Sequence, residues 1–410
     1  MNPERARAIP VLDGPRAVRS EPFGLWGRAF RPFFLGLALH AMLVIPWWVL
    51  AWLGALPVPA WLTPTLWHAH EMVFGFVAAA IAGFLLTASP VWSGGPALTG
   101  RPLIALVALW LAGRVAFAAA GVLPAGLVAG VDLAFLPAVA LAVVRTLWGS
   151  GQARNYAVVG IVVALALGNA ATHAEALGFA QGAARPGLRF AVDAVVVLIL
   201  VIGGRITPAF TRNALARAGL GETVRSWGWV DSLAIGAAGA LALATLVAGR
   251  THETGLLAVL AGLAAAVRLV GWQGWRVRGE PLLWSLHAGS AWVVAGLLLV
   301  GASDLGAAIP ATAGLHALTA GAMGSLVLAV ITRVGLGHTG RPLVLPRGVV
   351  LGYGLVHGAA AGRVAVPFLP GGEQGIVLLA SGLAWAAAFG IFAVRYWGIL
   401  TGPRPDGRPG

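Results

Sequence analysis

Two histidines, a carboxylate and a thioether fall within five consecutive residues, at His68, His70, Glu71 and Met72. A long apolar run follows them, and a run of that length predicts a helix that crosses a membrane. Ionisable side chains are costly in such a helix, so their presence indicates a function. Neutral imidazole is the commonest metal ligand among side chains, and methionine suits haem iron or Cu(I). The stretch therefore predicts metal or haem ligation; the alternative is an interfacial histidine pair beside Trp67, a membrane-belt residue.

Helical spacing divides this group of side chains. On an α-helix, His68, Glu71 and Met72 share one face, whereas His70 points roughly 200° away from His68. The two histidines therefore cannot easily bind one metal ion together, unless the helix begins after His68.

Histidines in other apolar runs extend the set of candidate ligands. His287 and His316 each follow an apolar stretch and are expected to face the interior of a bundle. A buried imidazole in lipid favours ligation or a proton relay, and both roles stay open for these two residues. His68, His70, His173 and His316 all fall near the expected outer ends of their runs, where they could converge into one cluster.

The remaining histidines favour a structural interpretation. We expect His40 and His357 to be core side chains with a hydrogen-bond partner, and this interpretation also leads for His173. His252 is expected in an outer loop beside Glu253.

Arginine combined with glycine, threonine and proline marks a second kind of candidate site. Such segments occur at 203–212 and 332–342, and a shorter one precedes the first apolar run. Arginine at a helix end can form a forked anion site suited to haem propionates or phosphate, and glycine lets the backbone approach a ligand closely. The alternative is simple anchoring of loops by positive charge. The candidate cofactor-binding residues are Arg31, Arg205, Arg212, Arg333, His338 and Arg341.

The composition identifies the class of protein that carries these side chains. Hydrophobic residues make up 59% of the 410 residues and charged residues only 10%, which is far more apolar than a soluble protein. All 27 basic residues are arginine, and they punctuate the ends of apolar runs. We therefore expect a lipid bilayer and no nucleic acid as partner. The absence of cysteine excludes disulfides, cysteine-ligated iron–sulfur clusters, c-type haem attachment and cysteine nucleophiles.

Apolar runs of spanning length predict an all-α polytopic bundle with about twelve transmembrane helices. Most arginines fall on one side of this layout, so the positive-inside rule places both termini in the cytoplasm. We expect a cytoplasmic tail at 1–32, a transmembrane domain at 33–399 and a second cytoplasmic tail at 400–410. The predicted spans are 33–55, 68–90, 102–121, 124–147, 156–178, 187–209, 229–249, 254–271, 282–302, 311–332, 347–368 and 375–398.

Seven sequence blocks together resemble the NnrS family. They run in order over most of the chain, which makes the combined pattern specific. The blocks are FRPFF (30–34), WHAHEMVFG (67–75), GFLLTA (83–88), GGRITPAFTR (203–212), PLLWSLH (281–287), HALTAGAMG (316–324) and TRVGLGHTGRPL (332–343).

The resemblance implies a haem- and copper-containing protein of the bacterial inner membrane, linked to nitric-oxide metabolism and nitrosative stress in denitrifying and related bacteria. It adds weight to His68, His70, His287 and His316 as metal ligands, without dividing them between haem and copper. Glu71 becomes the candidate catalytic residue, as a proton relay.

The leading hypothesis is a haem/copper membrane protein that binds or reduces nitric oxide and protects against nitrosative stress. Reduction would make the protein a membrane oxidoreductase, with quinol as the candidate electron donor; the resemblance leaves turnover open. The rival hypothesis is a transporter or assembly factor for copper, haem or an iron–nitrosyl species, which twelve helices with glycine-rich breaks also suit. A membrane sensor or scaffold without turnover is the third.

Overall fold

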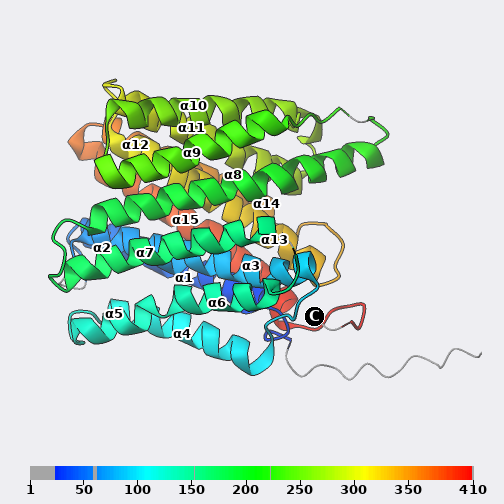
Figure 1. Ribbon diagram of the computed structural model, residues 1–410, viewed down its shortest axis with the longest axis horizontal. Helices are drawn as coiled ribbons and strands as arrows, with labels where there is room; N and C mark the ends of the chain where they lie inside the picture. The colour runs from blue at the N-terminus through cyan, green and yellow to red at the C-terminus, as the bar shows by residue number, and fades with distance from the viewer. Residues whose placement is uncertain (1–23, 59–61, 152, 222, 409–410) are drawn as a thin grey trace, which may run out of the picture.

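The structure is a computed structural model that describes residues 24–58, 62–151, 153–221 and 223–408. The described residues form helices and no strands, and twelve helical rods are long and apolar enough to cross a membrane. The predicted all-α bundle of twelve spans is therefore confirmed, and the chain is a multi-pass membrane protein. The rods run side by side along one common direction (Figure 1). Residues 1–23 of the predicted N-terminal tail lie outside the described residues.

Each predicted span overlaps one observed rod. The first to sixth are α1 (Phe30–Trp52); α2 (Pro64–His70) with η1 (Glu71–Val77) and α3 (Ala78–Ser93); α4 (Gly100–Ala118); α5 (Ala125–Leu133) with α6 (Phe135–Leu147); α7 (Ala157–Ala176); and α8 (Ala184–Arg217). The seventh to twelfth are α9 (Gly228–Ala248); α10 (His252–Gly271); α11 (Pro281–Asp304); α12 (Ala311–His316) with η4 (Ala317–Gly324) and α13 (Ser325–His338); α14 (Val349–Ala365) with η5 (Val366–Phe368); and α15 (Gly371–Thr401). Short 3₁₀ turns, η2 (Ala153–Tyr156) and η3 (Gly274–Val277), precede α7 and α11.

Helix ends differ from the predicted bounds where a rod continues past its apolar run. Helix α8 extends to Arg217 rather than 209, and α13 extends to His338 rather than 332. Hydropathy marks where the hydrocarbon layer ends, whereas backbone hydrogen bonding continues into the polar interface. These extra turns carry arginines beyond the apolar part of the bundle.

Two spans lie deeper in the bundle than the others. The second and tenth spans are the most buried of the twelve. Both contain a π-helical segment, η1 and η4, in which hydrogen bonds run to the fifth residue and the turn widens. Each π segment begins directly after a histidine, His70 in one span and His316 in the other. Segments of this kind are rare and occur frequently at functional sites.

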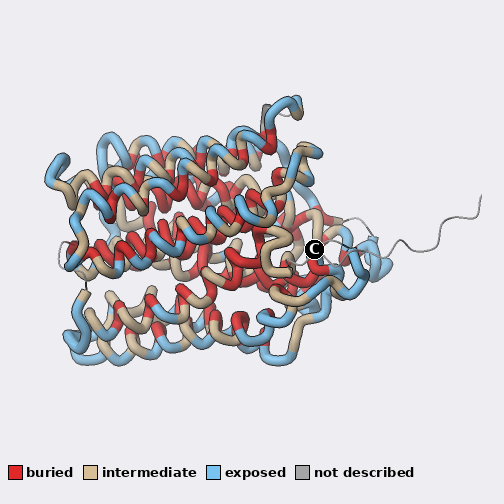
Figure 2. Tube along the Cα trace, turned by 90° about the horizontal axis from the view of Figure 1, so that it is seen from below, coloured by how far each residue is buried: buried red, intermediate tan, exposed pale blue. Residues whose placement is uncertain are grey.

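The other spans form layers around this pair. Helix α1 packs against α3 and α15, α14 packs on α15, and α11 contacts η4, α12 and α13. Helices α7 to α11 pack mostly on their sequence neighbours, while α4 to α6 form the opposite flank (Figure 1). Buried residues fill the interior and exposed residues follow the outside of the outer rods (Figure 2). Many exposed side chains there are large and apolar, for example Leu141, Leu167 and Val247, as a lipid-facing surface requires.

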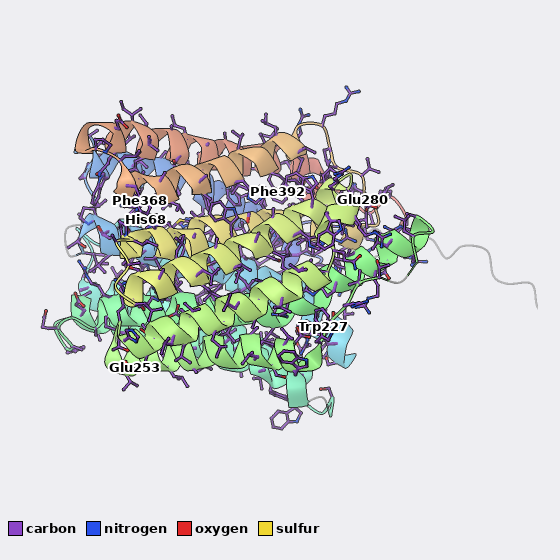
Figure 3. The ribbon with its side chains drawn as sticks, turned by 90° about the horizontal axis from the view of Figure 1, so that it is seen from above. His68, Trp227, Glu253, Glu280, Phe368 and Phe392 are labelled. Atoms are coloured by element: carbon purple, nitrogen blue, oxygen red, sulfur yellow. The ribbon has the colours of Figure 1, made fainter. Side chains whose placement is uncertain are left out.

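The two ends of the bundle can be told apart by the residues that lie there. His68, Glu253 and Phe368 lie at one end, here called the cavity end, and Trp227 and Glu280 lie at the opposite end (Figure 3). An even number of spans returns the chain to the side where it started. The two described chain ends meet at the opposite end, where a Cβ added to Gly24 would lie 2.3 Å from the carbonyl oxygen of Thr401. That this side is cytoplasmic stays a prediction.

Candidate functional site

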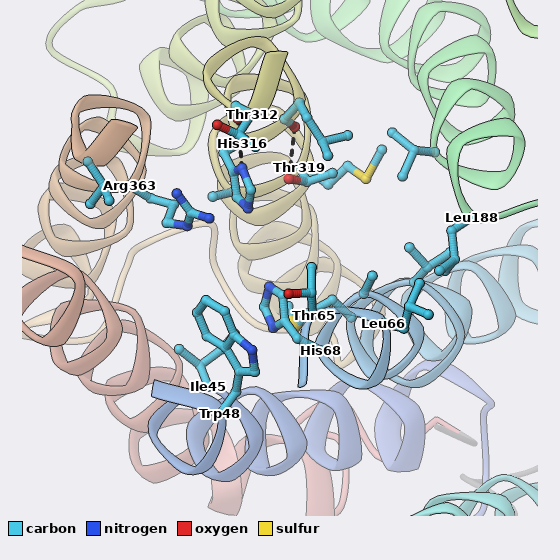
Figure 4. Close-up of a pocket in the computed structure, with 18 of the residues that line it drawn as sticks. Ile45, Trp48, Thr65, Leu66, His68, Leu188, Thr312, His316, Thr319 and Arg363 are labelled. Atoms are coloured by element: carbon cyan, nitrogen blue, oxygen red, sulfur yellow. Dashed lines mark hydrogen bonds between the residues drawn. The ribbon is translucent and has the colours of Figure 1, made fainter. Parts of the chain in front are cut away.

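A cavity of about 950 Å³ opens into the bundle at the cavity end. Its walls come from α1, α2, η1, α8, the end of α9 with the loop after it, α12, η4, α14, η5 and α15. The lining is mostly aliphatic and aromatic, with a small number of polar side chains. Ligand-binding cavities typically have this combination of size and lining. Two histidines, His68 and His316, are among the polar groups, and their rings face the same space from opposite walls (Figure 4).

His68 is held by the local structure of α2. Thr63 begins this helix by accepting a hydrogen bond from Leu66 N at 3.3 Å, and Pro64 occupies the first turn, where a missing N–H costs nothing. The His68 ring stacks on Trp48 of α1, with centroids 4.1 Å apart and an interplanar angle of 22°. Its Nδ1 is buried and has no hydrogen-bond partner among the described residues. The ring is therefore fixed by packing while a nitrogen stays available.

His316 is oriented by a hydrogen bond to its own helix. Its Nδ1 lies 2.7 Å from the carbonyl oxygen of Thr312, which can only accept, so Nδ1 carries the proton. Nε2 then holds the lone pair and is free to bind a ligand. Histidines that bind metals usually donate their other ring N–H to such an acceptor, which fixes the tautomer and the ring orientation.

Arg363 brings a positive charge to the same cavity as this histidine pair. It lines the cavity from α14 and points into it beside His316 (Figure 4). Its Nε has no hydrogen-bond partner among the described residues. A guanidinium with an unused N–H donor can bind a carboxylate or phosphate of a ligand.

Two further arginines on the cavity wall already have carboxylate partners. Arg189 Nε lies 2.9 Å from Asp193 Oδ2, and Arg250 Nε lies 2.5 Å from Asp304 Oδ1. Arg185 also lines the cavity but is exposed, so Arg363, which is half-buried beside His316, is the better candidate for an anionic group of a ligand.

His70 lies outside the cavity, in a separate network of buried charges. Its Nε2 lies 3.1 Å from Asp132 Oδ2 of α5, and its Nδ1 lies 3.2 Å from Glu71 Oε1. Arg114 of α4 pairs with both Glu71 and Asp132. His173 of α7 adds a contact of 2.8 Å from its Nε2 to Asp132 Oδ2. This network, here called the charge network, ties the second to fifth spans together.

The network separates residues that the sequence grouped together. Helical spacing put Glu71 on the face of His68 and Met72, but only His68 and Met72 line the cavity. The Glu71 carboxylate instead contacts His70, Arg114 and His40. The physical reason is that Glu71 lies about 60° around the helix from His68, on the side toward His70, so its carboxylate can reach partners on either face. The expected single outer cluster is likewise divided, because His68 and His316 face the cavity whereas His70 and His173 face Asp132.

A glycine makes room for the network at its inner edge. His40 Nε2 lies 3.3 Å from the carbonyl oxygen of Glu71. A Cβ added to Gly75 would lie 2.5 Å from that same ring nitrogen and 3.2 Å from Arg114 Cδ. Trp110 Nε1 donates to the Gly75 carbonyl oxygen at 3.0 Å, which fixes the backbone there. His40 therefore has a hydrogen-bond partner, as expected for a core histidine.

His287 lies apart from both groups, near the opposite end. Its Nε2 is 2.9 Å from Thr211 Oγ1, and that hydroxyl donates to the carbonyl oxygen of Thr207 at 2.9 Å. Gly274 approaches the ring so closely that a Cβ would lie 2.5 Å from His287 Nδ1. The structure does not bring His287 together with the other candidate ligands, so its predicted metal role remains a prediction.

The candidate cofactor-binding residues at the opposite end contact the chain itself. Arg31 is buried, and its NH1 donates to the carbonyl oxygens of Leu400 and Gly402 at 2.9 and 2.8 Å, which satisfies the C-terminal end of α15. The Arg333 guanidinium lies 3.9 Å from the centroid of the Phe210 ring. These contacts fit the anchoring alternative.

The other candidates at this end lie nearer the surface. Arg205 and His338 are exposed, and Arg341 reaches the carbonyl oxygens of Thr339 and Pro403 at 3.4 Å. Arg212 is half-buried, and its Nε has no hydrogen-bond partner among the described residues. Just beyond, Arg404 donates to Asp406 and lowers the pKa of that exposed carboxyl. No common anion site gathers these side chains within the described part of the chain.

Sequence reasoning missed Arg114, Asp132, Asn169 and Arg363 as members of candidate sites. A signal was present for Arg114 and Asp132, because each is an ionisable residue inside an apolar run. Arg363 likewise falls inside the predicted span 347–368, but nothing in the sequence indicates that it faces a cavity. Asn169 carries no signal of its own, since a polar amide in a membrane helix gains meaning only from its neighbours.

The family comparison covers nearly all of these elements. The family model described as "NnrS protein" matches residues 24–404, which include every span, the cavity and the charge network. Among curated proteins, none matches this chain. The match over almost the whole chain shows that this protein belongs to the NnrS family of nitric-oxide-related membrane proteins.

Proposed function

We propose that this chain holds haem in the cavity and binds nitric oxide there, in the bacterial inner membrane. The observation that carries the proposal is the pair of imidazoles, His68 and His316, which face one largely apolar cavity of about 950 Å³ from two separate spans. Histidine is a common axial ligand of haem iron, and an apolar wall suits the flat face of a porphyrin.

The donor chemistry of the cavity fits this group. His68 has a buried ring nitrogen without a partner, and His316 has its tautomer set by Thr312, which leaves Nε2 available. Haem carries two carboxylates, and Arg363 supplies a guanidinium beside the histidines. Trp48 fixes the His68 ring by stacking. Each of these side chains is in position before a ligand arrives, which lowers the cost of binding.

When bound, haem iron supplies a redox-active centre that binds diatomic gases. The protein's own part is to orient the two imidazoles, bind the carboxylates at Arg363 and exclude water with aliphatic walls. Nitric oxide is small and apolar, so it can reach a cavity between membrane helices through the lipid and needs no aqueous channel.

Reduction of nitric oxide would add two further requirements, electrons and protons. Quinol is the proposed electron donor, because it is soluble in the membrane. Glu71 is the proposed proton relay, since its carboxylate lies within the charge network on the same span as His68. Copper, the second proposed cofactor, would add a second redox centre. It would need ligands other than the pair that faces the cavity.

The decisive experiment uses the full chain purified in detergent. We expect a stoichiometric haem band that shifts when nitric oxide is added without oxygen. With a quinol or an artificial donor present, steady consumption of nitric oxide would identify a reductase, and binding without consumption would limit the protein to a binding role. Protein with no haem band, even after addition of haemin, would overturn the proposal.

A transporter or assembly factor for copper, haem or an iron–nitrosyl species is the second candidate. The large cavity at one end of the bundle, with arginines on its walls, is the observation that favours it. Uptake of copper or haem into vesicles, by protein that never holds haem stably, would support this alternative.

A further inference from the structure

Away from the cavity, three side chains from three spans each place one possible ligand atom in a common group. They are His70, Asp132 and His173, from α2, α5 and α7. Their ligand atoms all lie within 4.8 Å of one another, and all three residues are buried. Imidazole nitrogen together with carboxylate oxygen is a donor set for first-row transition metals such as zinc. We propose that this triad binds one such metal ion, at a site separate from the cavity.

The spacing of the donor atoms suits a tetrahedral ion. Asp132 Oδ2 lies 3.1 Å from His70 Nε2 and 2.8 Å from His173 Nε2. Two ligands about 2.0–2.1 Å from a tetrahedral ion are about 3.3 Å apart from each other. Each imidazole nitrogen is therefore within about 0.5 Å of the separation from Asp132 Oδ2 that a tetrahedral ion requires.

The charge network orients the triad in the way that metal sites require. His70 Nδ1 lies 3.2 Å from Glu71 Oε1, so the ring N–H away from the triad can donate to a carboxylate. Arg114 holds the second oxygen of Asp132 and also binds Glu71. Ligating histidines usually donate their other N–H to a carboxylate, and ligating carboxylates are in turn hydrogen-bonded. His70 also stacks on Phe117, with centroids 3.6 Å apart, which fixes its plane.

With Nδ1 donating to Glu71, His70 Nε2 becomes an acceptor that faces other acceptors. Besides Asp132 Oδ2, it lies 3.0 Å from Asn169 Oδ1. Asn169 Nδ2 donates a hydrogen bond to Asp132 Oδ2 at 2.8 Å. This bond fixes the orientation of the amide, so its oxygen faces His70. Three lone pairs pointed at one place repel each other unless a positive group lies between them. A metal ion supplies that group and also gives Asn169 a reason to face this way.

The balance of charges in the network also calls for a positive group at the triad. Among the described residues, Arg114 is the guanidinium that pairs with Glu71 and Asp132, and the other titratable groups in contact with these carboxylates are the imidazoles of His40, His70 and His173. When the imidazoles are neutral, two carboxylates and one guanidinium leave one negative charge in a buried part of the bundle. Unbalanced buried charge is costly, so a cation at the triad stabilises the whole network.

This site does not depend on a ligand in the cavity. None of the three residues of the triad lines the cavity. The inference goes beyond the proposed haem site, because that site rests on His68, His316 and Arg363, and none of these belongs to the triad. The two proposals can therefore fail separately.

The test measures bound metal in the full chain. Protein purified in detergent is stripped with a chelator, loaded with Zn²⁺ or Cu²⁺ in separate samples, freed of excess ion and analysed for metal per chain. We expect one retained equivalent in the wild type. Asp132→Asn and His173→Gln should each weaken retention by about tenfold or more, with the haem band unchanged. His357→Gln is the matched control, because His357 is a partly buried histidine in α14 that accepts from Trp292 Nε1 at 3.0 Å, outside both sites.

Two results would overturn the site. One is stripped wild-type protein that takes up no ion beyond any haem iron, which would mean that a proton on an imidazole balances the network instead. The other is equal retention by the wild type and the two triad variants. If those variants fold poorly, electron paramagnetic resonance of the Cu²⁺-loaded wild type decides. Coupling to two imidazole nitrogens is expected, and a spectrum with no nitrogen coupling excludes the triad. A missing haem band would count against the cavity proposal only.

Discussion

His68 and His70 are two positions apart in the chain, yet they belong to different parts of the bundle. His68 stacks on Trp48 at the cavity, whereas His70 stacks on Phe117 inside the charge network. The twist of one short helix, α2, thus directs neighbouring histidines to two candidate sites. One face of the helix lines the cavity, and the opposite face contacts the charge network.

Removal of either cavity histidine should abolish stable haem binding. We expect His68→Ala and His316→Ala each to lower the haem content of purified protein by about tenfold or more, because each removes an imidazole facing the cavity. The measurement is the haem band per chain. His287→Ala is the control, since His287 is buried elsewhere and bonded to Thr211. Equal losses in all three variants would contradict the division of sites.

Arg114→Gln should destabilise the bundle strongly. The substitution leaves two buried carboxylates, Glu71 and Asp132, without their guanidinium. Breaking a buried ion pair by removing one partner costs about 3–5 kcal/mol. Arg145→Gln removes an exposed arginine of α6 and should change stability by less than about 0.5 kcal/mol. Thermal unfolding in detergent provides the comparison; similar melting temperatures for the two variants would show that the network contributes little.

Gly75→Ala tests the close approach beside His40. The new Cβ would lie 2.5 Å from His40 Nε2, so the ring or η1 must shift. Overpacking of this kind costs about 1–3 kcal/mol. Gly236→Ala in α9 meets nothing within 4 Å and should be neutral or slightly stabilising, because alanine favours helix over glycine. If both substitutions stabilise the protein in chemical or thermal unfolding, the space at Gly75 is not limiting.

Arg31→Ala should loosen the end of the last span. Arg31 NH1 donates to two carbonyl oxygens at the C-terminal end of α15, and hydrogen bonds from charged donors contribute about 1.5–3 kcal/mol. We expect a lower unfolding temperature and faster proteolysis of the C-terminal tail. Arg395→Ala, an exposed arginine on the same helix, is the control. Unchanged proteolysis in the Arg31 variant would indicate that other contacts hold this end.

The number and order of the spans could be predicted from the sequence, because the hydrocarbon layer demands long apolar runs. The separate orientations of His68 and His70 could also be predicted, since helical geometry turns side chains by a fixed angle. The position of the Glu71 carboxylate could not, because its partners Arg114 and His40 come from other spans.

The membership of the charge network was also beyond sequence reasoning. Asp132 and Arg114 each stood out as an ionisable residue in an apolar run, but nothing in the sequence specifies that they meet. Their contact depends on how α4 and α5 pack against α2, which is a tertiary relationship. Arg363 entered the cavity for a similar reason, through the packing of α14.

The widened turns of η1 and η4 give each deep span room for an extra residue. Deleting one residue from 71–77 or 317–324 would let the rod close into a regular α-helix, with the two flanking parts close to their present orientation. Deleting one residue from an α-helical part of the same rod, for example from 78–93, would instead rotate one part by about 100° relative to the other. His68 would then face a neighbouring helix while the rest of the rod kept its place. A one-residue deletion within the two π segments should therefore be less harmful than a one-residue deletion in the adjoining α-helical turns.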